Sequence, residues 1–149
     1  LALNILDPFE TTKLAREVWI VPGTNTGMEG IGTQGNPYRA PGGLIDQVMR
    51  LLGHSVKIHL MAGLYRTNGF RLPEECLILG AGIGQSVVRL LDNATTAQNY
   101  PHIRMVTANA ADWWSKLFGM RDLTLDGNIG NQSIGTNKTI LWNKLPRVD

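Results

Sequence analysis

Arginine residues at alternating positions are the clearest candidates for binding chemistry in this sequence. Arg71, Arg89 and Arg104 each lie between apolar residues, so we expect their side chains to face outward from short strands. The planar guanidinium fork suits carboxylate and sulfate groups, so these side chains could line a face that holds an acidic polysaccharide. The same positions also fit an ordinary solvated surface. The predicted outward positions include Lys57, His59, Arg71, Arg89 and Arg104, with Arg121 at a predicted corner.

Two adjacent tryptophans and one aspartate complete the candidate ligand-binding residues. Trp113 and Trp114 cannot both point inward from an extended strand, and an exposed aromatic ring can stack on a sugar. The alternative is that they cover a corner, the helix or a partner. Asp126 could act with Asp122 as an acid–base pair, whereas the Asp-Gly-Asn sequence that it begins is typical of a turn. No residue is assigned a catalytic role.

Other site chemistries are disfavoured by the pattern. The glycines of residues 80–84 invite comparison with a phosphate-binding loop, but that loop must open a helix, and Val87 and Val88 indicate a strand. We therefore expect a glycine-rich corner. The three histidines lack zinc spacing and Cys76 is the only cysteine, so we expect no metal, no cofactor and no internal disulfide. Cys76 itself should be buried and unreactive.

The composition is that of a globular protein. Hydrophobic residues make up 43% of the 149 residues and charged residues 17%, which excludes a disordered chain. The 17 glycines indicate many tight turns. The net charge of +2 does not indicate nucleic-acid binding. No apolar run approaches the ~18–20 residues that cross a membrane. From the net charge and the lack of such a run, we expect neither nucleic acid nor membrane as a partner.

One amphipathic helix is predicted in the first half of the chain. A short strand over 18–21 and a glycine-rich loop over 24–43 precede it, and Gly53 follows as a stop signal. The predicted buried stripe comprises Leu44, Val48, Leu51 and Leu52, with Ile45 at its edge. The predicted solvent face carries Asp46, Gln47 and Arg50. The stripe should pack on the layer formed by Val56, Ile58 and Leu60.

The other predicted elements are short strands separated by glycine-containing turns. Apolar and polar residues alternate in most of them, which is typical of strands with one buried face. The predicted runs are 56–61, 70–72, 76–79, 88–90, 103–105, 118–120, 123–125 and 139–142. Strand centres recur at roughly twenty-residue intervals, the period of stacked repeats. These centres lie near Ile58, Ile78, Arg104, Thr124 and Ile140.

Local features indicate how these strands connect. The alternation shifts by one residue at 121–122, which predicts a corner there. No second helical pattern separates the strands, so a doubly wound α/β fold is disfavoured. A β-sandwich would fit the spacing, and Asn68 with Gly69 leaves a hairpin between Leu64 and Phe70 open as an alternative.

Four blocks carry a resemblance to a known superfamily. They read VWIVPG at 18–23 before the loop and helix, VKIHLMAGLYR at 56–66, CLILGAGIGQSVVRL at 76–90 and FGMRDLTLDGN at 118–128. In order and spacing they resemble the N-terminal part of the pectate-lyase-like superfamily. The resemblance implies an all-β, right-handed parallel β-helix, a single-stranded solenoid with an N-terminal capping α-helix. Residues 18–149 would be the cap and first coils of a longer protein, and residues 1–17 a leader or linker.

The same resemblance implies a carbohydrate-related function. The superfamily includes polysaccharide lyases, hydrolases, uronate epimerases, phage tailspikes and non-catalytic adhesins. We expect a domain that binds or processes a polysaccharide, with its catalytic residues outside this chain. The alternative is a non-catalytic glycan-binding adhesin, a viral tail or fibre, or a structural module. An extracellular, cell-surface or virion-surface location would follow. Further coils or a homo-oligomer would cover the C-terminal end.

Overall fold

The chain folds into three small sheets of parallel strands. A computed structural model describes residue 14 and residues 16–73, 75–94, 103–105, 118–132 and 141–142. Within these ranges the regular structure is almost entirely β, with one α-helix and two short 3-10 helices. Every pairing between strands is parallel. The expected all-β class is therefore confirmed.

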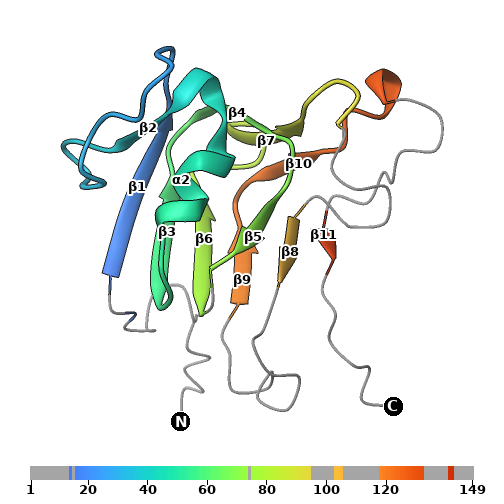
Figure 1. Cartoon of the computed structure of the whole chain (residues 1–149). Coiled ribbons are helices and arrows are strands. Elements are labelled where there is room, and N and C mark those ends of the chain that lie inside the picture. The colour runs from blue at the N-terminus through green and yellow to red at the C-terminus, as the bar shows by residue number, and fades with distance from the viewer. Residues whose placement is uncertain are drawn as a thin grey trace, which may run out of the picture.

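Each sheet gathers strands that are far apart in the sequence. The first sheet has the order β2 (Tyr38–Ala40), β1 (Arg16–Pro22), β3 (Val56–Leu60), β6 (Cys76–Gly80) and β9 (Phe118–Arg121). The second has the order β10 (Thr124–Asp126), β7 (Ser86–Leu90) and β4 (Gly63–Thr67). The third has the order β11 (Leu141–Trp142), β8 (Ile103–Met105) and β5 (Phe70–Leu72). Figure 1 shows β1, β3, β6 and β9 side by side.

From β3 onward the chain visits the three sheets in a fixed order. β3 is followed by β4 and β5, β6 by β7 and β8, and β9 by β10 and β11. Consecutive strands therefore belong to different sheets, and each strand pairs with one from the next visit. The hairpin alternative at Asn68 and Gly69 is wrong, because β4 and β5 lie in different sheets.

The even spacing of strand centres does not identify the strands that stack. Ile58 pairs with Ile78 as expected, but the next partner of Ile78 is Met120. Arg104 lies in the third sheet and Thr124 in the second. Connections of unequal length separate the strands, so a regular spacing along the sequence mixes positions from all three sheets.

The core consists of rows of inward side chains. In β3, Val56, Ile58 and Leu60 are buried, whereas Lys57 and His59 remain partly exposed, as the alternation predicts. Because parallel pairing is in register, each inward residue lies next to an inward residue of the neighbouring strand. The core is therefore continuous from β1 through β3 and β6 to β9.

Buried hydroxyl groups join successive corners between the first and second sheets. The Tyr65 hydroxyl lies 2.7 Å from the carbonyl oxygen of Ile20 and 2.8 Å from that of Met61. The Ser86 hydroxyl donates to the carbonyl oxygen of Leu60 at 2.8 Å. These hydroxyl groups bond to carbonyl oxygens at or near the C-terminal ends of β1 and β3, next to the turns that follow those strands.

Positive φ angles mark the turns. Asp122, with φ of 58°, forms the corner between β9 and β10 that the shifted alternation predicts. Its carbonyl oxygen would lie 2.1 Å from a Cβ at Gly80, so only glycine fits beside that corner. Ser55 and Glu75 have φ of 58° and 54° and directly precede β3 and β6. The same conformation therefore recurs at stacked positions.

Helix α2 (Ile45–Leu51) packs by a stripe that differs from the predicted one. The buried stripe is Ile45, Val48, Met49 and Leu52, an i, i+3, i+4, i+7 pattern. Leu51 is 62% exposed, so its predicted burial is wrong, and Ile45 belongs to the core instead of its edge. The helix lies mainly against β5, β2 and β4, although its Met49 shares a small cavity with Leu60 of the predicted layer.

Asp46 is buried, which overturns its predicted place on the solvent face. Its carboxylate accepts hydrogen bonds from the Thr67 hydroxyl and, at 2.8 Å, from the Asn68 backbone N–H. Burial raises the pKa of Asp46, and the hydrogen bonds from Thr67 and Asn68 oppose that shift. Asp46 therefore pins the helix to the corner between β4 and β5.

The N-terminal elements differ from the predicted boundaries. Strand β1 begins at Arg16, inside the segment expected to be a leader, and residues 1–13 and 15 lie outside the described residues. The predicted loop over 24–43 contains β2 and a 3-10 turn at Pro41–Gly43. In the described part of the chain, no helix is long and apolar enough to cross a membrane.

Substitutions on opposite faces of α2 should differ sharply in their effect on stability. Val48 is fully buried, so Val48→Asp should lower the free energy of unfolding by several kcal/mol through an unpaired buried charge. Arg50 is exposed, so Arg50→Ala should change it by no more than about 0.5 kcal/mol. Urea unfolding at neutral pH measures both values, and equal effects would contradict the docking of α2.

Cys76 should react slowly with thiol reagents in the native protein. The side chain is fully buried, and burial raises the pKa of its thiol to about 12. Labelling by a disulfide reagent should therefore be orders of magnitude slower than in the urea-unfolded chain, which serves as the control. Labelling at the same rate in both states would show that Cys76 is accessible.

Candidate functional site

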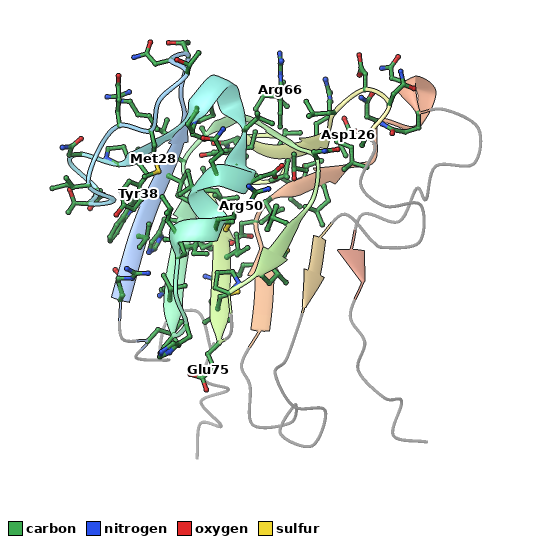
Figure 2. The ribbon with its side chains drawn as sticks, in the orientation of Figure 1. Met28, Tyr38, Arg50, Arg66, Glu75 and Asp126 are labelled. Atoms are coloured by element: carbon green, nitrogen blue, oxygen red, sulfur yellow. The ribbon has the colours of Figure 1, made fainter. Side chains whose placement is uncertain are left out.

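The second sheet carries a row of charged side chains on its outer face. Arg66 pairs in register with Arg89, and Arg89 pairs with Asp126. Arg66 and Arg89 are exposed, while their neighbours Tyr65 and Val88 are buried. We call Arg66, Arg89 and Asp126 the arginine row. Figure 2 labels Arg66 and Asp126 on this sheet.

One end of the arginine row is a tight ion pair. The Arg89 guanidinium donates from Nε to Asp126 Oδ2 at 2.6 Å, and the two side chains are 47% and 33% exposed. Asp126 Oδ1 accepts a hydrogen bond from the Asn128 backbone N–H at 2.8 Å. The Asn128 N–H and then Arg89 lower the pKa of Asp126. The turn interpretation of Asp126 is therefore supported by a local side-chain to backbone bond.

Arg66 differs from Arg89 in having no such partner. No described residue forms an ion pair or a side-chain hydrogen bond with it. Its position beside Arg89 places two guanidinium groups on neighbouring strands, which are about 4.8 Å apart. The row therefore carries two positive charges and one negative charge, with the excess at Arg66.

A second row on the same face is mostly aliphatic. Leu64 pairs in register with Val87, and Val87 with Thr124. Leu64 is 40% exposed, and the Thr124 hydroxyl accepts a hydrogen bond from the Gly84 N–H at 2.9 Å. We call Leu64, Val87 and Thr124 the aliphatic row. It lies two residues from the arginine row, or about 6.6 Å along the strands.

The remaining predicted arginines lie on a different sheet. Arg71 in β5 pairs in register with Arg104 in β8, and Arg104 pairs with Trp142 in β11. The backbone thus brings Arg71 and Arg104 together, but it separates them from Arg89. Trp113 and Trp114 lie outside the described residues.

The outer face of the first sheet holds a small polar cluster. The Trp19 and His59 rings stack with centroids 4.4 Å apart and planes 7° apart. Glu17 lies 3.8 Å from both Lys57 and His59. Burial lowers the pKa of His59, and Glu17 opposes that shift. In register, the row that contains His59 continues through Leu79 to Arg121.

The cations that the sequence predicts to face outward therefore lie in strands of three sheets, not one. Sequence reasoning missed Arg66, Trp19 and Glu17 as parts of these clusters. Each of these residues lies next to a buried residue in its strand. For Arg66 and Trp19, the alternation of apolar and polar residues in the sequence could have indicated an outward side chain. Their neighbours across the sheet depend on register, which the sequence does not contain.

The described residues offer binding groups more clearly than catalytic ones. Asp122 lies 3.1 Å from Arg121, and Asp126 pairs with Arg89, so each carboxylate has its own arginine. No group of three or more His, Cys, Asp or Glu side chains that could hold a metal ion occurs in the described ranges. The glycines of residues 80–84 form the turn between β6 and β7 with no helix after it, as expected.

Comparison with known proteins identifies relatives of part of the chain. The mannuronan C5-epimerase AlgE1 of Azotobacter vinelandii is 38% identical over 84 residues, which are 51% of this chain and 6% of the relative. AlgE4 and AlgE5, mannuronan C5-epimerases of the same organism, are 37% and 36% identical over 84 residues. The chain matches 14% and 8% of their lengths. It thus spans a small part of these relatives. No family profile and no solved structure matches it.

The ion pair at the end of the arginine row should contribute little to stability on its own. Arg89→Ala should lower the free energy of unfolding by less than about 1 kcal/mol, because the pair is solvent-exposed. Asp126→Ala should cost more, because it also removes the acceptor of the Asn128 N–H. Asp126→Asn keeps that acceptor and should resemble Arg89→Ala.

The pH dependence provides a second measurement on the same pair. The pKa of Asp126 is lower in the folded than in the unfolded protein. The ionised carboxylate therefore stabilises the fold above the unfolded pKa, and this stabilisation is lost as the pH falls through the folded pKa. Urea unfolding should therefore show that the free energy of unfolding falls less between pH 7 and pH 3 in Asp126→Asn than in the wild type. An identical pH profile would contradict the pair.

Proposed function

We propose that this chain forms the N-terminal coils of a right-handed parallel β-helix of the pectate-lyase-like type, with α2 as its cap. The repeated visit to three parallel sheets supports this proposal, as does the burial of α2 against β5, β2 and β4. Residues 18–149 belong to the cap and first coils. In this proposal, further coils of a longer protein stack on β9, β10 and β11.

The protein acts on a polysaccharide, and the reaction is epimerisation at C5 of a uronate unit. The observation that carries this proposal is the 36–38% identity to mannuronan C5-epimerases over 84 residues. Mannuronan bears one carboxylate on each sugar unit, so it is a polyanion. The exposed arginines of the second sheet, and the register row of Arg71 and Arg104, suit such a polymer.

Epimerisation at C5 needs a base, an acid and a cation near the carboxylate, and this chain contributes the cations. C5 lies next to the carboxylate carbon, so a base removes the C5 proton and an acid returns a proton to the opposite face. The step is redox-neutral, and a nearby cation lowers its barrier by stabilising charge on the carboxylate. The catalytic acid and base lie outside this chain. Arg71, Arg89, Arg104, Trp113 and Trp114 contribute to binding the polymer, whereas the Asp126 carboxylate pairs with Arg89 and opposes binding of a polyanion.

The location and partners follow from this substrate. A polymeric polysaccharide is encountered outside the cell, so the protein is extracellular or acts at a cell surface. Its partner is the polysaccharide itself, without nucleic acid or membrane.

The test is proton exchange at C5 in heavy water. The full-length protein is incubated with mannuronan, and proton NMR follows both inversion at C5 and loss of the C5 proton signal. Epimerisation predicts inverted units that carry deuterium at C5. Ultraviolet absorbance detects the unsaturated ends that a lyase would form, and a reducing-end assay detects hydrolysis.

Two outcomes would overturn the proposal. Unsaturated or reducing ends without inverted units would assign a lyase or hydrolase instead. Polymer binding without any chemical change in mannuronan or other uronate polymers would favour the non-catalytic glycan-binding alternative.

A further inference from the structure

We infer that the outer face of the second sheet is a binding site for a carboxylate-bearing polysaccharide chain, anchored by Arg66, with Asp126 competing for Arg89. This inference rests on the proposed function for the nature of the ligand. The polymer lies across the strands, from β4 over β7 to β10. Its carboxylates face the arginine row, and its sugar rings cover the aliphatic row.

Arg66 is the group that most needs an anionic ligand. Its side chain is exposed, and no described residue pairs with it. It also lies in register beside Arg89, and like charges on neighbouring strands are unfavourable. A carboxylate bound at Arg66 relieves that repulsion and accepts the two parallel hydrogen bonds of the guanidinium fork.

Asp126 already pairs with the second arginine of the row, Arg89. Its carboxylate occupies Arg89 at 2.6 Å, as a ligand carboxylate would. Asp126 is held in place by the Asn128 N–H, so it competes from a fixed position. A ligand must exchange with it to reach Arg89. Removing the charge of Asp126 should therefore strengthen binding.

The spacing of the face matches a repeating polymer. Adjacent strands lie about 4.8 Å apart, and each contributes one residue to the arginine row and one to the aliphatic row. A uronate ring has an apolar C–H face and one carboxylate. β4 and β7 present aliphatic and cationic contacts in that same combination, whereas β10 contributes Thr124 and Asp126. A neutral sugar offers the guanidinium groups hydroxyls but no carboxylate.

Binding of defined oligomers to the full-length protein tests the site. The probes are a fluorescently labelled mannuronate oligomer and a neutral mannose oligomer of equal length, measured by anisotropy at low and moderate salt. Arg66→Ala should weaken mannuronate binding about tenfold, the loss of one charge-assisted pair. Asp126→Asn should tighten it several-fold. Arg50→Ala, which removes an equal charge from the exposed face of α2, should change it less than twofold.

The outcomes separate this inference from the proposed function. Equal effects of Arg66→Ala and Arg50→Ala on mannuronate binding, or weaker binding by Asp126→Asn, would overturn the site. Neither result would contradict the proposed function, which the C5 inversion assay tests separately. Equal binding of the neutral oligomer would also overturn it. Thermal melting of each variant shows whether the fold is retained, and Arg66→Lys, which keeps the charge but not the fork, should bind at an intermediate level.

Discussion

In-register pairing of parallel strands is the constraint on which this structure depends. The pairing fixes Ile58 beside Ile78 and Ile78 beside Met120, so each inward residue must fit the same layer as its neighbours. A shift by one residue would turn Lys57 inward and Ile58 outward. The corners reinforce the register, because Gly80 accepts the close approach of Asp122 and the Tyr65 hydroxyl bonds to the carbonyl groups of Ile20 in β1 and Met61 after β3.

The same constraint produces the features of the surface. Register that stacks apolar residues inside also stacks Arg66 on Arg89 outside, and the Asp126 carboxylate balances one of these charges. In the proposed complex, a polymer with one carboxylate per unit lies across a sheet in which each strand contributes one side chain to the arginine row.

Local features of the structure were predictable and long-range ones were not. The alternation in β3, the turn after Gly80 and the corner at Asp122 depend on neighbouring residues, and the sequence predicts them. The distribution of arginines over the sheets depends on connection lengths, so Arg104 and Arg89 could not be separated. The burial of Asp46 depends on Thr67, which is distant in sequence. The buried stripe of α2 is likewise not determined by spacing, because Met49 and Leu51 are both apolar and the positions of β5, β2 and β4 decide which of them is buried.

The distance between β4 and β10 tests the account most directly. Nitroxide labels on the double variant Arg66→Cys and Asp126→Cys would lie on the outer face, two strands apart, while the buried Cys76 stays unlabelled. Two strand spacings separate their backbones by about 10 Å. Continuous-wave electron paramagnetic resonance should therefore show strong dipolar broadening, absent from either single variant. Spectra of the double variant that equal the sum of the single variants would contradict the stacking and the arginine row that it creates.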